Sequence, residues 1–324
     1  MLGGCAAPQP DADRTNGETA VETPGSAPTT EEPSVESGTP ELPLTFTSDD
    51  GVDIEVTSLD RVLVLDDASI EIAHALGVGD AIAITPEISL LEDLAAQAET
   101  RISTGGQGAL TVEGVVALDP TLVLASNMRR HADLVTGLRN VGIPAALIDT
   151  SQPAADKISK TGELFGVAEA GDALAATVQE QIDQAHANVA DVPEEERPRV
   201  MVLSSSGAGD SGQTTAAGQS TPAHEIVVAA GGHNTGAEAG LDRYQVITAE
   251  GLIAARPEII VVAESELSDL GGEEGIWSTV PGLSGTPAAE TQSLLVIEDT
   301  QIKFSGVSTG DAVLSVQSAL FPEL

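Results

Sequence analysis

The chain has little of what many functions require. Among 324 residues there is one cysteine, Cys5, so neither an intrachain disulfide nor a cysteine-based metal cluster can form. Only 13 lysines and arginines stand against 51 aspartates and glutamates, which gives a formal net charge of −38. Because phosphate groups bind to basic surfaces, this balance argues against nucleic acid as a partner and against direct adhesion to anionic lipids. The charge indicates a surface adapted to solubility or to salt.

Other residue types and motifs that are scarce or absent exclude further classes of function. The aromatic residues include only one tryptophan, Trp277, and one tyrosine, Tyr244. No apolar run reaches the roughly 18 residues that a membrane-spanning helix needs. The sequence contains no HExxH motif and no P-loop, and the glycine-rich stretch at 204–220 lacks a lysine to hold a phosphate. We therefore expect that the protein is not an enzyme, and that Tyr244 is its only source of a phenolate.

One stretch of the sequence occurs twice. Residues 111–120 read TVEGVVALDP, and residues 248–257, which lie 137 positions later, read TAEGLIAARP. Residues 61–65 (RVLVL) and 199–203 (RVMVL) form a second similar pair, 138 positions apart, and Glu71-Ile72 and Glu225-Ile226 form a weaker third. Three pairs in the same order indicate one architecture built twice. The sequence therefore predicts two similar lobes, with a ligand cleft between them.

The amino-terminal residues predict a membrane tether. Leu2, Gly3 and Gly4 before Cys5 resemble a lipobox, the signal at which bacterial lipoproteins are lipidated, although no basic and apolar leader precedes them here. Residues 6–45 are rich in Pro, Thr, Ser, Gly and acidic residues without apolar periodicity, which is typical of a disordered spacer. We expect residues 1–45 to be a lipobox remnant and a flexible tether, lipidated at Cys5, that anchors an extracytoplasmic protein.

Strands and helices are predicted to alternate after the tether. Compact apolar segments at 61–65, 121–125 and 144–149 predict strands, whereas 69–77, 111–119 and the later part of 127–140 predict helices. Thr111 suits the N-cap position of its helix, and Glu113 suits the first turn. Residues 46–153 are therefore predicted to form an amino-terminal α/β lobe.

The remaining residues repeat this scheme after a linker. Residues 154–190 have a polar-faced helical pattern without proline, which predicts a helical linker made of one long helix or a helix pair. Residues 191–324 then form the second α/β lobe, with strands at 199–203 and 259–263, helices at 222–230 and 248–256, and a closing helix at 307–320. The predicted fold class is α/β, with two similar Rossmann-like lobes joined by a long helical linker. We expect modest closure of the lobes, because a helical connection bends less easily than crossed strands.

These segments resemble class III, or helical-backbone, substrate-binding proteins, which feed ABC importers for heme, siderophores and corrinoids. The resemblance covers about residues 58–320 and rests on RVLVLDDASIEIAHALGVGD, LTVEGVVALDPTLVLAS, AAGQSTPAHEIVVAAGGHNT and ITAEGLIAARPEIIVV, in that order. The position of the tyrosine and the tail PGLSGTPAAETQSLLVIED are most similar to heme-uptake lipoproteins. The resemblance implies heme as the transported ligand and an importer permease with its ATPase as partners. We expect a monomer.

Tyr244 is the first candidate heme ligand. Imidazole and phenolate both bind heme iron, and a phenol with an ordinary pKa near 10 loses its proton only to the metal or with help from a nearby cation. Tyr244 follows Arg243 and precedes Thr248 by four residues, in a loop expected to face the cleft. The resembled heme proteins have a ligand tyrosine there, commonly with an arginine two residues later, where this chain has Val246. The alternative is an ordinary interface tyrosine.

His131 is the second candidate heme ligand. It follows the predicted strand 121–125, and ligands of α/β lobes bind beyond the carboxyl ends of strands. Some heme-uptake proteins of this kind oppose the tyrosine with a histidine of the first lobe. Met128 offers a soft side chain to the porphyrin, and Arg129 and Arg130 are the only adjacent arginines in the chain. With Arg243, these arginines are predicted to meet heme propionates or the phenolate; the alternative for the pair is a solvated loop that balances acidic surroundings.

Glu113 and Glu250 occupy equivalent positions of the repeat. In the resembled class, one exposed glutamate on each lobe pairs with arginines of the permease, and a two-fold symmetric permease needs matching contacts from both lobes. The alternative is that each glutamate only compensates the dipole of its helix.

The sequence therefore predicts a lipid-anchored, extracytoplasmic heme-binding protein of an ABC importer, with His131 and Tyr244 as axial ligands. The alternative within the class is a ferric-siderophore or corrinoid-binding protein, in which Arg129, Arg130 and Arg243 meet carboxylates of the ligand. A structural or adhesive envelope lipoprotein without a small ligand is a hypothesis from a different class.

Overall fold

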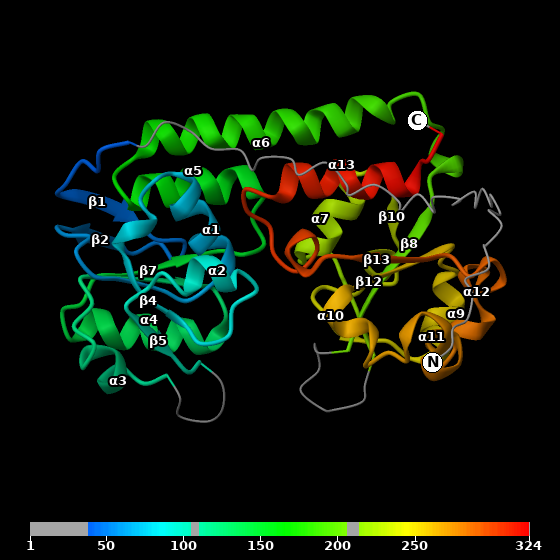
Figure 1. Ribbon diagram of the computed structural model, residues 1–324, viewed down its shortest axis with the longest axis horizontal. Coiled ribbons are helices and arrows are strands. Elements are labelled where there is room, and N and C mark those ends of the chain that lie inside the picture. Colours follow the sequence, from blue (N-terminus) through cyan, green and yellow to red (C-terminus); the bar gives the residue numbers. More distant parts are fainter. Residues whose placement is uncertain (1–37, 105–109, 206–213, 324) are drawn as a thin grey trace, which may run out of the picture. The chain divides into compact units, whose positions relative to one another are not determined.

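The computed structural model describes residues 38–104, 110–205 and 214–323. They form two α/β lobes, each built on its own sheet (Figure 1). The predicted lipidation site Cys5 and most of the predicted tether lie outside the described residues. Within these three ranges, no helix combines the length and the apolar composition that crossing a bilayer requires.

The first lobe contains a five-stranded parallel sheet with the strand order β5-β4-β3-β6-β7 and a separate antiparallel hairpin, β1–β2. Its elements, in order, are β1 (Leu44–Thr47), β2 (Asp53–Val56), β3 (Val62–Val64), α1 (Asp67–Ala75), η1 (Gly79–Ala81), β4 (Ile82–Pro86), α2 (Glu92–Ala95), β5 (Thr100–Ile102), α3 (Val112–Val116), β6 (Leu122–Ser126), α4 (Arg129–Asn140) and β7 (Ala145–Ile148). Two helices follow, α5 (Ala154–Leu164) and α6 (Ala168–Asn188).

The side chains of the first sheet alternate between two cores. Val62 and Val64 of β3 belong to one core, together with residues of α1 and α5, whereas Leu63 belongs to another, together with residues of α3 and α4. This alternation follows from the two-residue period of a strand that is covered on both faces. The first lobe therefore has three layers, with helices on both sides of the sheet.

The second lobe has the strand order β11-β9-β8-β12-β13, and β10 pairs with the beginning of β8. Its elements, in order, are η2 (Glu194–Glu196), β8 (Arg199–Ser204), β9 (Thr215–Ala216), α7 (Pro222–Ala229), β10 (His233–Asn234), α8 (Thr235–Glu238), β11 (Gln245–Val246), α9 (Ala249–Ala255), β12 (Ile259–Ala263), α10 (Glu264–Leu267), α11 (Gly272–Thr279), η3 (Leu283–Gly285), α12 (Pro287–Thr291), β13 (Leu294–Ile297), η4 (Asp299–Gln301) and α13 (Thr309–Leu320).

The repeat in the sequence is also a repeat in strand register. In the first lobe Val62 pairs with Leu122, and in the second Val200 pairs with Ile259. These are equivalent positions of the two similar segment pairs. The helix starts match as well, because the Oγ1 atoms of Thr111 and Thr248 each accept the N–H of the residue three positions later, at 3.1 Å in both copies. The predicted duplication and the predicted α/β class are thus confirmed.

Several element boundaries differ from the prediction. The helix expected at 69–77 begins at Asp67, because the carboxylate of Asp66 accepts the Ser69 N–H at 3.0 Å and makes Asp66 the N-cap. The helix expected at 111–119 ends at Val116. The linker is a helix pair, and α5 and α6 approach closely where Gly162 meets Gly171: a Cβ atom on Gly162 would lie only 2.7 Å from the Cα of Gly171.

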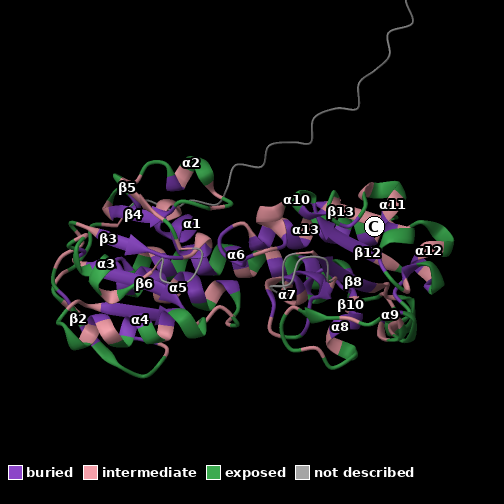
Figure 2. Ribbon diagram, turned by 90° about the horizontal axis from the view of Figure 1, so that it is seen from below, coloured by how far each residue is buried: buried purple, intermediate pink, exposed green. Residues whose placement is uncertain are grey.

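The two lobes share one hydrophobic core. A single cluster of buried side chains contains Val62 of the first sheet and Val200 of the second, along with Leu174 of α6 and Val313 of α13. Helix α6 packs against α5, α7 and α13, and Figure 1 shows it running alongside α5 and α13. Figure 2 shows the buried residues concentrated in the two sheets and in the inner sides of the helices. Since this core continues between the lobes, a wide separation would expose apolar surface.

The matched helix starts generate the first prediction. Replacing Thr111 or Thr248 by alanine removes the acceptor of one orphan N–H and is expected to lower the free energy of unfolding by about 1 kcal/mol each. Urea denaturation followed by circular dichroism measures this loss. The serine variants, which keep the hydroxyl, should retain most of the stability, and equal losses for serine and alanine would contradict the capping role.

Candidate functional site

Two adjacent strands of the first sheet end in polar side chains. Asn127 and Asp149 directly follow β6 and β7, which are paired so that Ser126 lies beside Ile148. The Asn127 Nδ2 donates to Asp149 Oδ1 at 2.5 Å, and the Thr150 hydroxyl donates to Asn127 Oδ1 at 3.1 Å. Sheets of this kind bind ligands beyond the carboxyl ends of their strands, so this edge is the first wall of a candidate site.

His131 lies beside this edge, in the first turn of α4, and is completely buried, with 0% of its surface exposed. Its Nδ1 lies 2.9 Å from the Ser126 hydroxyl, and its Nε2 lies 3.4 Å from Nε of Arg130. Because the Arg130 N–H donates, Nε2 is the acceptor, and the proton of the neutral ring is on Nδ1, which donates to Ser126. Burial and then the Arg130 charge lower the pKa of His131 to about 4. The imidazole is therefore neutral at neutral pH, with its lone pair on Nε2.

The start of α4 gathers positive charge. Met128 is the N-cap residue without a side-chain capping bond, and the first turn contains Arg129 and Arg130 but no acidic residue. All three of these side chains are exposed. Since a helix amino terminus already carries partial positive charge, two arginines there are unfavourable for the helix itself and favourable for an anion from outside it.

Arg243 belongs to the second lobe but acts on the first. Burial alone would raise the pKa of the Asp149 carboxyl. Hydrogen bonds from Ser151 and Asn127, together with the charge of Arg243, nevertheless lower this pKa below its usual value. Asp149 follows β7, and Arg243 directly precedes Tyr244. The charge of Arg243, a predicted site residue of the second lobe, therefore acts at the carboxyl edge of the first sheet.

Tyr244 is half-buried and packs against the core that both lobes share. Burial and then the charge of Glu266 raise the pKa of its phenol above the ordinary value. Glu266 is itself buried, accepts the Ser205 N–H at 2.8 Å and forms an ion pair with Lys303 at 2.9 Å. Tyr244 is therefore a neutral phenol in the ligand-free protein, and the charge that shifts its pKa is that of Glu266 and not that of Arg243.

A cavity of about 230 Å³ lies between the lobes, next to Asp149. Such a volume is below the roughly 300–1,000 Å³ of typical ligand pockets, so it forms the floor of a larger site at most. Its lining comes from both lobes: Thr150, Ser151 and Pro153 on one side, and Gln219, Thr221, Pro222, His224 and Glu225 on the other.

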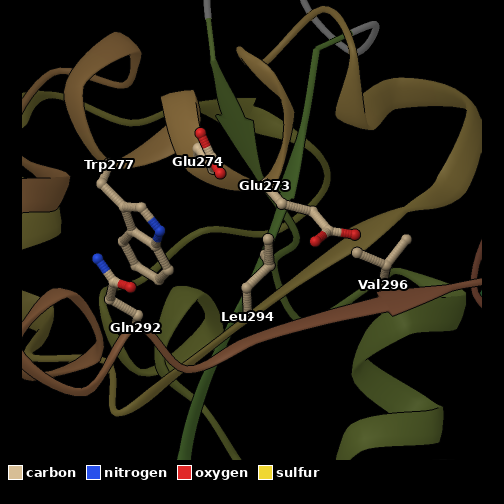
Figure 3. A pocket seen from close by; sticks show the side chains of 6 residues that line it. All are labelled: Glu273, Glu274, Trp277, Gln292, Leu294 and Val296. Carbon is tan, nitrogen blue, oxygen red and sulfur yellow. The ribbon is translucent and has the colours of Figure 1, made fainter.

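A larger hollow, of about 690 Å³, is lined by residues of α11, β13 and the turn between α12 and β13 (Figure 3). Trp277 and Gln292 lie on one side of it, and Glu273 and Glu274 on another. None of the candidate ligand or docking residues lines this hollow. Tryptophan fluorescence therefore reports on a different part of the second lobe than Tyr244 does.

Glu113 and Glu250 are both exposed, each in the first turn of the short helix that the repeat encodes. Val116 and Ile253, three residues further along each helix, are also exposed, at 42% and 45%. The two helices therefore present the same pair of side-chain types, one acidic and one apolar.

A serine spacing that is typical of hydrolases also occurs. Residues 306–310 read GVSTG, which matches GxSxG. In the structure Ser308 is the N-cap residue of α13, and its backbone N–H and that of Val307 both donate to Glu71. This segment follows η4 rather than a strand, so it lacks the strand–turn–helix context of a nucleophile elbow.

Sequence reasoning missed Ser126, Asn127, Asp149 and Glu266. Ser126 is separated from His131 by five positions and orients its ring, and the other three set charges around the cleft. Their positions in the sequence carried a usable signal only for the first strand pair, since Ser126 and Asn127 come after the predicted strand 121–125 and Asp149 ends the predicted strand 144–149. The residue that corresponds to Tyr244 in the first repeat, Gln107, lies outside the described residues.

The model of a family described as periplasmic binding protein matches residues 62–300. A curated relative, a cobalamin-binding protein of Halobacterium salinarum, is 30% identical over 207 residues, which are 64% of this chain and 54% of that protein. The chain thus spans about half the length of the curated relatives it matches.

Two solved structures are similar over most of the chain. The periplasmic heme-binding protein RhuT from Roseiflexus sp. RS-1, in its apo form, has a TM-score of 0.69 and 26% identity, and the match covers 81% of this chain and 98% of that one. The periplasmic heme-binding protein BhuT, in complex with two hemes, has a TM-score of 0.68 and 26% identity, with coverage of 80% and 97%.

The coupling between Arg243 and Asp149 is open to direct measurement. Replacing Arg243 by glutamine removes the positive charge opposite Asp149 and is expected to raise the pKa of that carboxyl. The contribution of Asp149 to stability is present above its unfolded pKa and is lost as the pH falls through the lower folded value, so in the variant this loss begins at a higher pH. NMR titration of the carboxyl carbon measures the shift. Arg129→Gln is the matched control, and an unchanged pKa of Asp149 in Arg243→Gln would contradict the coupling.

Proposed function

Because the chain belongs to the periplasmic binding protein family, we propose that it binds heme outside the cytoplasm and delivers it to an ABC importer for iron acquisition. The observation that supports this most is His131, a buried neutral imidazole whose Nε2 accepts from Arg130 at a helix start that also carries Arg129. Imidazole, phenolate and cations for propionates are the groups that ferric heme needs.

In this proposal the iron replaces the Arg130 N–H at Nε2 of His131. The hydrogen bond from Nδ1 to Ser126 keeps the ring oriented and the tautomer unchanged, as second-shell partners of metal-bound histidines do. Arg130, released from the ring, joins Arg129 at the propionates, while the exposed Met128 lies against the porphyrin.

Tyr244 supplies the second axial ligand in this proposal. Its phenol must lose a proton when it binds iron, because burial and Glu266 keep it protonated in the free protein. Ligation by Tyr244 therefore releases a proton, so heme binding strengthens as the pH rises. Arg243 contributes a cation at the same end of the cleft, for a propionate or for the phenolate.

A corrinoid is the second candidate ligand. It is favoured by the cobalamin-binding relative and by Glu266, whose negative charge opposes the phenolate that ferric heme would use. In that case Tyr244 remains a neutral hydrogen-bonding group. Heme remains the first choice because the two similar structures described above, which cover most of this chain, are heme-binding proteins.

Delivery involves the two repeat helices. Glu113 and Glu250 would pair with arginines of a two-fold symmetric permease, which is driven by its ATPase, and the exposed Val116 and Ile253 would lie at the same contacts. The protein would act as a monomer, held at the membrane by a lipid on Cys5 and by the tether that follows.

Titration with hemin tests the ligand. We expect a saturable shift of the Soret band, and a loss of affinity of at least about tenfold, or 1.4 kcal/mol, for His131→Ala and for Tyr244→Phe. His186→Ala, which removes a histidine from the outer helix α6, is the matched control and should bind like the wild type. Saturable binding of cyanocobalamin without a hemin response would instead establish the second candidate, and silence towards both would favour an envelope-structural role.

Charge reversal tests the docking helices. The double variant Glu113→Lys, Glu250→Lys should bind hemin with unchanged affinity but fail to support growth on hemin as the iron source in cells that lack the wild-type protein. Glu169→Lys, which changes another exposed glutamate on α6, should support growth. If the double variant also supported normal growth, the two glutamates would have no role in docking.

A further inference from the structure

The third and weakest pair of the sequence repeat has the most unusual surroundings in the structure. Glu71 of α1 and Glu225 of α7 occupy equivalent positions in the two lobes. Glu225 lines the small cavity between the lobes, and Glu71 is not among the residues that line it. Both accept backbone hydrogen bonds at a helix start across the lobe boundary: Glu71 from the residues before α13, and Glu225 from the first residue of α5, the linker helix that packs on the first lobe.

Glu71 reaches from the first lobe to the start of α13. Its Oε2 accepts the Val307 N–H at 2.5 Å, and its Oε1 accepts the Ser308 N–H at 3.2 Å. Glu71 is only 2% exposed, and Gly306 leaves the room it needs, because a Cβ atom there would collide with the carboxylate. Two oxygens thus hold two N–H groups across the boundary between the lobes.

Glu225 makes the reverse connection. Its Oε1 accepts the N–H of Ala154, the first residue of α5, at 2.9 Å. Helix α5 packs on α1 and β1 of the first lobe, whereas Glu225 belongs to α7 of the second. Since α5 follows β7 and α13 follows β13, the last strand of each sheet, the two contacts are related by the internal symmetry of the chain.

A buried cation lies between the two contacts. Lys157, one turn after Ala154 on α5, is 3% exposed and donates from Nζ to the Ser305 hydroxyl, just before the segment that Glu71 holds. Both Glu225 and Glu71 act on it electrostatically. The first N–H groups of a helix have no partners within it, and carboxylates stabilise the positive end of the helix dipole, so charge and hydrogen bonding act together at both contacts.

We propose that Glu71 and Glu225 are positioning residues that form a reciprocal clamp, in which each lobe fixes a helix start of the other and so sets the angle between the two walls of the ligand site. Lys157 supports the clamp from within. The effect on the lobe angle does not depend on which ligand is bound, whereas the effect on affinity rests on the proposed function. If the angle between the lobes is fixed before binding, the binding free energy does not include the entropic cost of ordering the lobes.

The two contacts predict different responses to glutamine. Glu71 uses both oxygens, so Glu71→Gln places an NH₂ group against a backbone N–H and loses one bond. Glu225 uses one oxygen, so Glu225→Gln can keep its bond, whereas Glu225→Ala cannot. Gly306→Ala displaces the Glu71 carboxylate without removing any charge.

The experiment measures the distance between the lobes in the ligand-free full chain. Spin labels at Val141→Cys and Glu290→Cys, in a Cys5→Ser background, are read by pulsed electron resonance. We expect a narrow distribution for the parent and for Glu225→Gln, and a broadened or shifted one for Glu71→Gln, Glu225→Ala and Gly306→Ala. The control is Glu258→Gln, which alters a carboxylate bond to the Arg199 N–H, measured at 3.0 Å, within one lobe.

The outcomes separate the clamp from simple stabilisation. A lower melting temperature in any variant, including the control, does not bear on the clamp. Only the clamp variants should change the distribution of distances between the spin labels. Unchanged distributions for Glu71→Gln, Glu225→Ala and Gly306→Ala would overturn the proposal. With hemin, the variants that broaden the distribution should bind about tenfold more weakly than the control, and failure of the parent to bind hemin would refute the proposed ligand without affecting the distance result.

Discussion

The rest of the structure depends on how the two lobes are held relative to each other at the starts of α5 and α13. Glu225 accepts the N–H of Ala154, which begins α5, and Glu71 accepts the N–H groups of Val307 and Ser308, which directly precede the first residue of α13. Because these helices also contribute to the core that both lobes share, electrostatics and apolar packing restrict the same motion. The walls of the proposed ligand cleft are therefore placed by elements that contain neither His131 nor Tyr244.

Much of the fold was accessible from the sequence, and the reason is local. The repeated segments encode strand pairs and N-caps whose geometry depends on residues a few positions apart, so the offsets of 137 and 138 predicted the matching registers of Val62 with Leu122 and Val200 with Ile259. The bonds from Glu71 to α13 could not be predicted in this way, since they join residues 236 and 237 positions apart. In the sequence, Glu71 and Glu225 were only a weak similarity between two helices.

The site was partly accessible for a different reason. Scarcity made Tyr244 and the arginine pair conspicuous in a chain with one tyrosine and few cations. Abundance hid Glu266, because nothing in the sequence distinguishes this carboxylate among 51 acidic residues. Nor does the pattern around His131 reveal that the ring is buried or that Arg130 covers its Nε2, since both depend on how α4 leaves its strand and on the rotamer of the arginine.

The shared register has a consequence for the design of new receptors. Since β3 with β6 and β8 with β12 pair in the same phase, segments exchanged between the lobes at these strands keep their neighbours in the sheet. The strands therefore offer crossover points for a symmetrised protein assembled from two copies of one half. Such a protein would carry the Tyr244 loop on both sides of one cleft. The matching strand registers of the two lobes define the positions at which the two halves can be joined.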